Sequence, residues 1–321
     1  MKDTNPLANE SGVIVMVREK VGHARQAQAV AQAMALPYQI VDHRDPNAIA
    51  KMTAASHVIA AGRQSISAAR KAARRGDGVT CVLQPVQWRP ADFDVIWSPA
   101  HDRHAPTWLF RPPEVRLFTL TAPSLTPSPK KAPWVVPAEL RRPLVAVLIG
   151  GPTRIHRMRG DEIDELATRL RAFALAHDVS LLIATSRRTP RGAVETLRRA
   201  LRDVPHLCVD ARQPEETGIV DPVATFLSVC DAAVVTTDSF AMLSEAAAFG
   251  APILGWRLPS GRSKFDALHE GLIAHGAMRW FDGTLPLWSY PPLNPAHEIA
   301  TAIRGRMGLP PAPSTATSDG V

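Results

Sequence analysis

The sequence predicts an α/β protein in two halves, each built around a parallel β-sheet. Short apolar runs alternate with helical patterns along most of the 321 residues, and 45% of these residues are apolar, enough to bury a sizeable core. The strands are separated by helices, which indicates parallel neighbours because parallel strands need a crossover connection. The alternation breaks once, between Leu120 and Pro143, where six prolines occur and favour extended chain.

Residues 1–120 are expected to form the first domain. An Ala- and Gln-rich helix runs to about Ala35 before Pro37 stops it, a short helix follows Pro46, and a basic helix ends near Arg75. Apolar runs bounded by turn residues mark the predicted strands of this half, which are Val13–Val17, Tyr38–Val41, Val58–Ala61, Val79–Leu83 and Val95–Trp97.

Residues 121–143 are predicted to be a proline-rich linker, and residues 144–293 a second domain of similar design. The predicted strands of this domain are Leu144–Ile149, Val179–Ala184, Leu207–Val209, Ala232–Val235 and Pro252–Leu254. The predicted helices are Asp161–Ala176, Arg191–Arg202, Pro222–Val229, Phe240–Phe249 and Ser263–Ala274. A last helix, over 294–308, is marked by Asn294 as its cap, Pro295 in its first turn and Gly308 at its end. Residues 309–321, rich in Pro, Ser and Thr, are expected to be a disordered tail.

Charge is distributed unevenly between the halves. Residues 1–140 carry 17 Lys and Arg against 11 Asp and Glu, whereas residues 141–321 carry 20 against 19. A basic first half suits an anionic lipid, a phosphorylated substrate or nucleic acid. Nucleic acid is the least favoured of these, because aromatic residues make up only 6% and no nucleic-acid module is recognised.

Cellular location is predicted from three features. No apolar run approaches the roughly 20 residues of a membrane span, and Met1–Gly12 lacks the apolar core of a signal peptide. The cysteines (Cys81, Cys208 and Cys230) are odd in number and far apart, which favours reduced buried thiols over disulfides. We expect a cytoplasmic protein, with peripheral contact to the inner face of an anionic membrane as an extension of that location.

The strongest site pattern is the strand–turn–helix sequence Val234–Ala246. The amides at the start of its helix, together with the helix dipole, suit a phosphate group, and Asp238 and Ser239 stand at this turn. Glu245 follows Ser239 by six residues, about 9 Å along the helix axis, where it would meet sugar hydroxyls beside a pyrophosphate. The alternative is an ordinary capping serine and a solvated glutamate.

Two further loops follow predicted strands. Gly150 and Gly151 allow close approach of backbone to a ligand and precede three arginines, although a tight turn with a basic face has the same pattern. The segment Thr185–Pro190 supplies hydroxyls and guanidinium groups that suit phosphate oxygens. Together these loops predict an anion site whose residues are Thr185, Ser186, Arg187 and Arg188 beside Gly150 and Gly151.

The first half offers two strand-end groups. Lys20, Gly22 and His23 lie where the first strand meets its helix, and His101 and Asp102 follow the fifth strand. His23 could act as a general base, cap its helix or bind a phosphate. No metal site is predicted, because the Asp92–Asp94 pair precedes a strand and the other loops are basic; nor does a dinucleotide, P-loop or hydrolase motif occur.

The sequence resembles the mitochondrial fission protein family named after the plant "elongated mitochondria" factor, over roughly residues 13–308. The blocks that carry the resemblance are Lys20–Gln26 (with Val21 as a departure), His101–Asp102, Gly150–Pro152, Thr185–Pro190, Thr237–Ser239 and Ser244–Ala246. Bacterial members of this family are described as glycosyltransferases or nucleoside-diphosphate-sugar epimerases.

The resemblance implies a GT-B-like fold, in which two Rossmann-like domains face a cleft and the last helix returns to the first domain. It implies that Ser239 and the following amides hold the diphosphate of a nucleotide-sugar and that Glu245 contacts the ribose. Arg187 and Gly151 would lie near the same ligand, and His23 in the acceptor domain.

The expected activity is metal-independent transfer of a sugar from a nucleotide-sugar to an envelope lipid or glycan, without a cofactor, and with His23 or Asp102 taking the acceptor proton. Lys20, Gly22 and His101 would lie on the acceptor side. An epimerase and a non-catalytic adaptor remain the alternatives.

Overall fold

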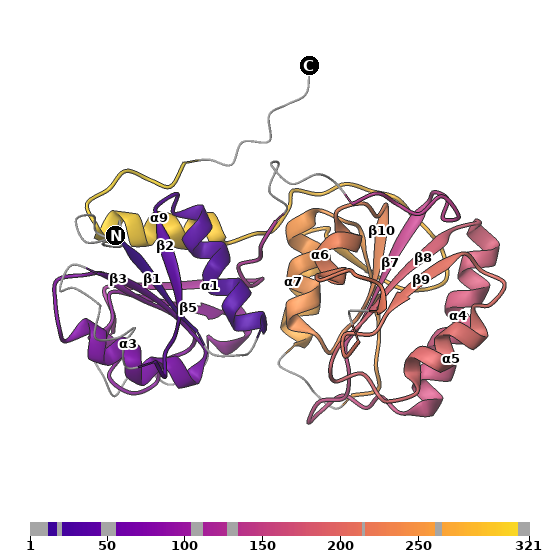
Figure 1. Cartoon of the computed structure of the whole chain (residues 1–321), viewed down its shortest axis with the longest axis horizontal. Helices are drawn as coiled ribbons and strands as arrows, with labels where there is room; N and C mark the ends of the chain where they lie inside the picture. Colours follow the sequence, from indigo (N-terminus) through magenta and orange to yellow (C-terminus); the bar gives the residue numbers. More distant parts are fainter. Residues whose placement is uncertain are drawn as a thin grey trace, which may run out of the picture. The chain divides into compact units, whose positions relative to one another are not determined.

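The described part of the protein forms two α/β units. The structure, a computed structural model, describes residues 12–17, 21–45, 56–103, 112–126, 134–213, 216–260 and 265–313. Unit 1 comprises Met1–Leu125 together with Asn294–Val321, and unit 2 comprises Thr126–Leu293 (Figure 1). Each unit contains one six-stranded sheet whose neighbouring strands are all parallel. The predicted α/β class with two Rossmann-like domains is confirmed.

The sheet of unit 1 has the strand order β2-β1-β3-β4-β5-β6. Its strands are β1 (Val13–Val17), β2 (Tyr38–Asp42), β3 (His57–Ala61), β4 (Thr80–Leu83), β5 (Val95–Pro99) and β6 (Val115–Thr119). Its helices are α1 (Val21–Ala33), α3 (Ile66–Ala73) and α9 (Ala296–Arg306), with short 3-10 turns at η1 (Arg63–Ser65), η2 (Pro90–Asp92) and η3 (Ala100–Asp102). The short helix expected after Pro46 lies outside the described residues.

Helices cover both faces of this sheet. Helix α3 packs through Ala68 and Ala69 on the face that presents Met16, Val58 and Ile96. Helices α1 and α9 contact each other, and they also contact β1, β3 and β5 (Figure 1). Residues that alternate with the first face along the strands, such as Val15 and Trp97, are therefore buried as well. This burial on both sides explains why the strands are almost continuously apolar.

Helix α9 belongs to unit 1 although it follows unit 2 in the sequence. Its buried Arg304 donates one hydrogen bond to the Met34 carbonyl at 2.8 Å and another to the Pro310 carbonyl at 2.7 Å. At its start, the Asn294 side chain exchanges hydrogen bonds with the backbone of Ser124 and accepts one from the Ala296 amide. These contacts join chain segments that are far apart in sequence.

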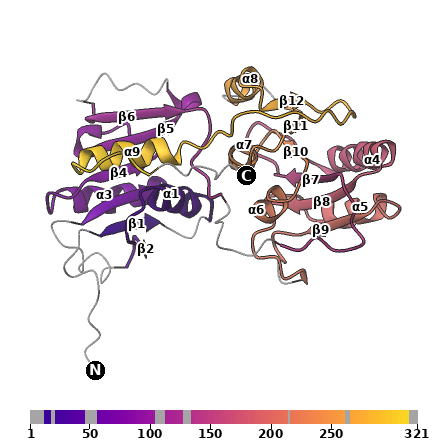
Figure 2. The ribbon, with the colours of Figure 1, turned by 90° about the horizontal axis from the view of Figure 1, so that it is seen from above.

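The sheet of unit 2 has the order β12-β11-β10-β7-β8-β9. Its strands are β7 (Leu144–Ile149), β8 (Ser180–Thr185), β9 (His206–Val209), β10 (Ala232–Thr236), β11 (Ile253–Trp256) and β12 (Met278–Trp280). Its helices are α4 (Gly160–His177), α5 (Ala193–Ala200), α6 (Pro222–Leu227), α7 (Phe240–Phe249) and α8 (Asp266–Ala274). Helices α4 and α5 cover one face, and α6 and α7 cover the other (Figures 1 and 2).

The order of the strands defines where ligands bind in such sheets. In unit 2 the chain runs from β7 outward to β9 and then returns to β10 on the other side of β7. In unit 1 it runs from β1 to β2 and returns to β3 on the other side of β1. Crevices form at these switch points, beyond the carboxyl ends of the strands. The loops after β7 and β10, and those after β1 and β3, therefore occupy the favoured positions.

Candidate functional site

The loops after β7 and β10 are joined by hydrogen bonds at the switch point of unit 2. The Gly150 amide donates to Thr236 Oγ1 at 2.8 Å, and the Gly151 amide donates to Asp238 Oδ2 at 2.9 Å. The Thr236 hydroxyl in turn donates to Asp238 Oδ1 at 2.8 Å. The adjacent strands β7 and β10 thus carry their terminal residues into one rigid cluster.

The loop after β8 joins the same cluster. Ser186 Oγ donates to the Gly150 carbonyl at 2.8 Å, and Thr189 Oγ1 donates to that carbonyl at 2.5 Å. The Arg188 guanidinium reaches the Gly151 carbonyl at 2.7 Å. Three strand-end loops that are separate in the sequence therefore lie together in unit 2.

Asp238 and Arg188 form an ion pair. The Asp238 side chain is completely buried and pairs at 3.0 Å with the guanidinium of Arg188, which is 46% exposed. A buried carboxylate without such a partner would be strongly unfavourable, so the pair stabilises the loop cluster. Both residues hold the loops together, and the expectation that they also contact a ligand stays a prediction.

The two glycines are required by the protein's own packing. A Cβ atom on Gly150 would lie 2.3 Å from Asp238 Oδ2, and one on Gly151 would lie 2.4 Å from the backbone carbonyl carbon of Arg188. The sequence had suggested that these glycines make room for a ligand. The space that a Cβ would take at each glycine is occupied by Asp238 or Arg188, whose close approach fixes the shape of the loops, and contact of this backbone with a ligand stays a prediction.

The N-terminal end of α7 stands directly beyond this cluster. Ser239 is its N-cap, and the Ser239 hydroxyl accepts a hydrogen bond from the Met242 amide at 3.4 Å. No acidic residue occurs in the first turn, so the positive end of the helix dipole is not neutralised there by its own sequence. Glu245 lies farther along α7 and is half-buried.

The remaining predicted residues of the β8 loop separate into two groups. Arg187 is exposed beside Arg188. Thr185 is buried and directed toward the end of β9, where its hydroxyl accepts from the Ala211 amide at 3.2 Å and approaches Asp210 at 3.4 Å. Of these two, only Arg187 is exposed for contact with an anion from solvent.

Aromatic rings border the start of α7, and the sequence had not identified them. The Phe265 ring is stacked on His156 at 6.0 Å and on Phe240 at 6.4 Å between centroids. Phe240 is the first residue of α7, so the stack lies beside the helix end. The residues come from three loops, and no local periodicity indicates that they meet.

Two buried histidines support these loops. His156 Nδ1 lies 2.9 Å from Thr153 Oγ1, and His269 Nε2 lies 3.1 Å from the Thr237 carbonyl. Burial lowers the pKa of His156, an effect that Arg188 reinforces and Asp238 and Asp266 oppose. Burial also lowers the pKa of His269, against the opposing effect of the Thr237 carbonyl. Both rings therefore favour the neutral form.

The predicted residues of unit 1 lie at strand ends. Lys20 is outside the described residues, whereas Gly22 is exposed at the start of α1. His23 packs against the turn after β3, so closely that a Cβ on Gly62 would lie 2.6 Å from His23 Nδ1. This turn requires glycine, since Gly62 has φ of 86°. His23 therefore stands at the switch point of unit 1.

His101 and Asp102 form part of η3, directly after β5. Strands β3 and β4 lie between β1 and β5, so the strand that leads to His23 and the strand that leads to Asp102 are three spacings apart, about 14 Å. The two residues proposed for proton transfer thus belong to different parts of the sheet edge.

Metal-binding clusters and membrane-spanning helices are both absent from the part of the chain that the structure describes. There, no cluster of three or more His, Cys, Asp or Glu side chains has the arrangement of a metal site. No helix among the described ranges combines the length and the apolar character that a bilayer crossing needs.

Two solved structures align with most of this chain at low similarity. A UDP-glucosyltransferase from Polygonum tinctorium covers 81% of this chain and 83% of its own, with 11% identity and a TM-score of 0.42. A candidate UDP-N-acetylglucosamine 2-epimerase from Listeria monocytogenes aligns with 95% of this chain over 93% of its own, with 11% identity and a TM-score of 0.44. At these low scores nothing about function follows from the likeness.

Sequence relatives are more informative. The chain is 31% identical over 274 residues to the mitochondrial fission protein ELM1 of Arabidopsis thaliana, a match that covers 77% of this chain and 62% of that protein. It is 26% identical over 164 residues to the uncharacterized protein RP120 of Rickettsia prowazekii, covering 50% of this chain and 45% of that one. The matches thus span less than two thirds of either relative. The family model described as mitochondrial fission ELM1 matches residues 21–307, and the chain therefore belongs to this family.

Proposed function

We propose that the protein is a glycosyltransferase whose unit 2 binds a nucleotide-sugar. The observation that carries this proposal is the hydrogen-bonded cluster of the loops after β7, β8 and β10, which stands beside the N-terminal end of α7 at the switch point of the sheet. Helix ends of this kind bind phosphate groups, and switch points are where such sheets bind ligands.

In this proposal the donor lies along the first two turns of α7. Ser239 and the amides that follow it hold the diphosphate, and the exposed Arg187 supplies planar donors to its oxygens. Glu245, about 9 Å farther along the axis, accepts hydrogen bonds from the ribose hydroxyls. Arg188 and Asp238 act through the loop cluster as positioning residues.

The reaction is a displacement at the anomeric carbon of the sugar. An acceptor hydroxyl forms the new glycosidic bond while the bond to the diphosphate breaks, and the nucleotide leaves with that electron pair. Arg187 and the helix dipole stabilise the negative charge that develops on the diphosphate. His23 or Asp102 in unit 1 takes the acceptor proton, since an imidazole and a carboxylate are both groups that act as general bases.

The acceptor in this proposal is a lipid or glycan of the cell envelope. Supporting this, Trp88 is 56% exposed, and the guanidinium groups of Arg70 and Arg89 lie 5.0 Å and 5.6 Å from its ring. An exposed tryptophan among arginines suits peripheral contact with an anionic membrane.

A thermal-shift panel of UDP-, GDP-, CMP- and ADP-sugars tests the donor site. A nucleotide-sugar at about one hundred times its Kd should stabilise unit 2 by about 2.7 kcal/mol, a rise in Tm of about 5 °C or more. Glu245→Ala should abolish this response, because its carboxylate holds the ribose. Glu165→Ala removes an exposed carboxylate of α4 in the same unit and should leave the response intact.

Product analysis separates the alternatives. Slow release of free nucleotide supports transfer, whereas a new sugar isomer without nucleotide release identifies an epimerase. No response to any nucleotide-sugar, with Glu245→Ala indistinguishable from wild type, would instead favour an adaptor without catalysis, the role that the name of the plant relative suggests.

A further inference from the structure

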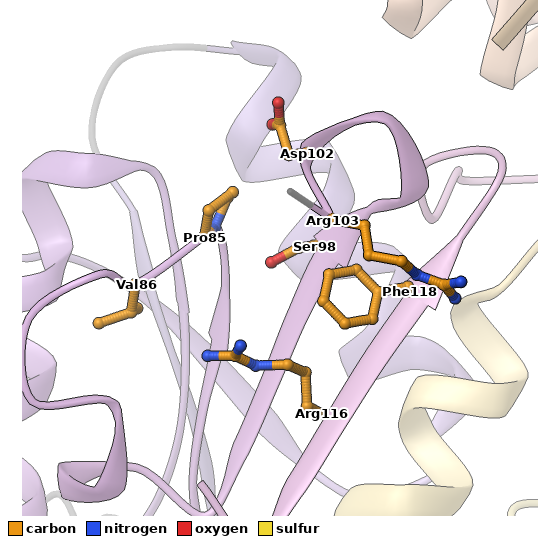
Figure 3. Close-up of a pocket in the computed structure, with 7 residues that line it drawn as sticks. All are labelled: Pro85, Val86, Ser98, Asp102, Arg103, Arg116 and Phe118. Carbon is orange, nitrogen blue, oxygen red and sulfur yellow. The ribbon is translucent and has the colours of Figure 1, made fainter. Parts of the chain in front are cut away.

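Unit 1 contains a small hollow at the edge of its sheet that is separate from the loops of unit 2. It lies where β4, β5 and β6 end, and it encloses about 220 Å³ that is partly open to solvent. Part of this volume is open solvent, so the hollow is shallow and suits no more than one small chemical group. Figure 3 shows its lining residues, which are Pro85, Val86, Ser98, Asp102, Arg103, Arg116 and Phe118.

Arg116 is the central feature of this hollow. In the register of the parallel pair it stands beside Ile96, and Phe118 stands beside Ser98, so the side chains of these four residues lie on one face of the sheet. The Arg116 guanidinium extends into the hollow, below Ser98 and toward Pro85 (Figure 3). Taking part of a charged side chain out of water costs free energy unless the charge is compensated.

The Arg116 side chain has a buried polar atom that is not satisfied. Its Nε is inaccessible to solvent and has no hydrogen-bond partner among the residues that the structure describes. Burial lowers the pKa of this guanidinium, which reports the cost of removing its charge from water. The acidic residue in the lining, Asp102, directs its carboxylate away from Arg116 (Figure 3). An anion in the hollow would compensate this cost.

Two further hydrogen-bond donors, the Arg103 guanidinium and the Ser98 hydroxyl, line the hollow. The Arg103 guanidinium lies 5.1 Å from the centre of the Phe118 ring, and that of Arg116 lies 5.9 Å from it, so one aromatic ring orients two cations. In Figure 3 the Ser98 hydroxyl lies on the same side of the Phe118 ring as the Arg116 guanidinium, whereas the Arg103 guanidinium lies on the other side of the ring; Ser98 is only 3% exposed. The Arg116 guanidinium and the Ser98 hydroxyl supply donors that match the acceptor oxygens of a phosphate, and Arg103 adds positive charge at the rim.

We propose that this hollow binds a phosphate group, as a free phosphomonoester or as the headgroup of a phospholipid. Arg116 and Ser98 donate hydrogen bonds to its oxygens, and Arg103 adds charge at the rim. All of its residues belong to unit 1, so it shares none with the nucleotide site proposed in unit 2, although Asp102, one of the two residues proposed to take the acceptor proton, also lines it.

Calorimetric titration of the full chain with glycerol 3-phosphate, at constant ionic strength, tests the site. Arg116→Gln should weaken binding by about tenfold or more, since a charged hydrogen-bond donor is lost. Ser98→Ala should weaken it severalfold with little effect on folding. Lys71→Gln removes one exposed positive charge from α3 of the same unit and should leave the affinity unchanged.

Hydrogen exchange locates the bound phosphate. Protection should appear in peptides that cover β5, η3 and β6, and it should disappear in Arg116→Gln. Phosphate bound at α7 would instead protect peptides of unit 2 and would not respond to Arg116→Gln, so failure of this proposal is distinguishable from failure of the nucleotide site. If Arg116→Gln fails to fold, weaker binding of glycerol 3-phosphate by Arg103→Gln and Ser98→Ala tests the site instead.

Vesicles distinguish the two sources of phosphate. Binding to phosphatidylcholine vesicles that contain phosphatidic acid, without affinity for glycerol 3-phosphate, identifies a headgroup, whereas tight binding of glycerol 3-phosphate identifies a free ester. Acetate, an anion without a phosphate group, should not bind to the hollow. Absence of binding to both probes, or binding that Arg116→Gln and Ser98→Ala leave unchanged, overturns the proposal.

Discussion

At Gly151 a single methyl group would collide with backbone, which makes this residue a sensitive test of the loop cluster. Its Cβ would lie 2.4 Å from the carbonyl carbon and oxygen of Arg188, neither of which can rotate away as a side chain can. We expect Gly151→Ala to lower the free energy of unfolding by about 1–3 kcal/mol, the usual range for overpacking. Urea unfolding monitored by circular dichroism measures this change.

Gly160 is the matched control for Gly151. A Cβ there meets no atom within 4 Å, and the residue begins α4, where alanine is a better helix former than glycine. Gly160→Ala should therefore unfold at the wild-type urea concentration or slightly above it. Equal midpoints for Gly151→Ala and wild type would show that the loops after β7 and β8 are not packed as closely as described.

Helix α9 is held to the rest of unit 1 by the buried side chain of Arg304. Arg304 satisfies two backbone carbonyls, those of Met34 and Pro310, and it is only 9% exposed. Arg304→Met keeps the aliphatic length but leaves these carbonyls unsatisfied, so we expect a loss of about 1–3 kcal/mol. Hydrogen exchange should show the loss in α1 and α9, with the peptides of unit 2 unaffected.

Arg306 provides the comparison within the same helix. It pairs with Glu114 and lies 3.9 Å from Asp94, but its side chain is 38% exposed. Exposed ion pairs contribute little, so Arg306→Met should cost less than about 1 kcal/mol. If the two variants were equally stable, the contacts of Arg304 with Met34 and Pro310 would not stabilise α9.

The whole molecule should lose stability as the pH falls below neutrality. Burial lowers the pKa of His57 in unit 1 and of His156 and His269 in unit 2. The unfolded chain then binds these protons at a higher pH than the folded chain, so the stabilisation is complete above about pH 6.5 and is lost as the pH falls through that value. Tm should be highest near pH 7 to 7.5 and should fall from pH 7 to 5.5.

His156→Gln tests the origin of this pH dependence. The variant removes one of the three groups, so its Tm should fall less between pH 7 and 5.5 than that of the wild type. Burial raises the pKa of Asp210, but its hydrogen bonds with Arg212 lower that pKa by more. Asp210 therefore contributes to the pH dependence of stability only at lower pH, near the ordinary pKa of a carboxyl group. A Tm that does not change from pH 7.5 to 5.5 would contradict the prediction.

Most strands and helices could be predicted because their patterns are local. The helix Phe240–Phe249 has the predicted bounds and begins after Ser239 as its cap; in the structure it ends at Gly250, whose φ is 76°. Two strands were missed, β6 and β12. Each is short, lies at the edge of its sheet and contains an arginine, Arg116 or Arg279, so neither has the apolar run that marks the central strands.

The sequence by itself determined the α/β class and which strand ends carry polar residues, since periodicity and turn chemistry act over a few residues. Only the tertiary structure decided what these residues do. Gly151 and Asp238 are 87 positions apart and Arg188 and Asp238 are 50 apart, yet they bind each other because the return of the chain to β10 makes β10 a neighbour of β7. The same holds for Arg116, whose place in a hollow depends on the register of β6 against β5.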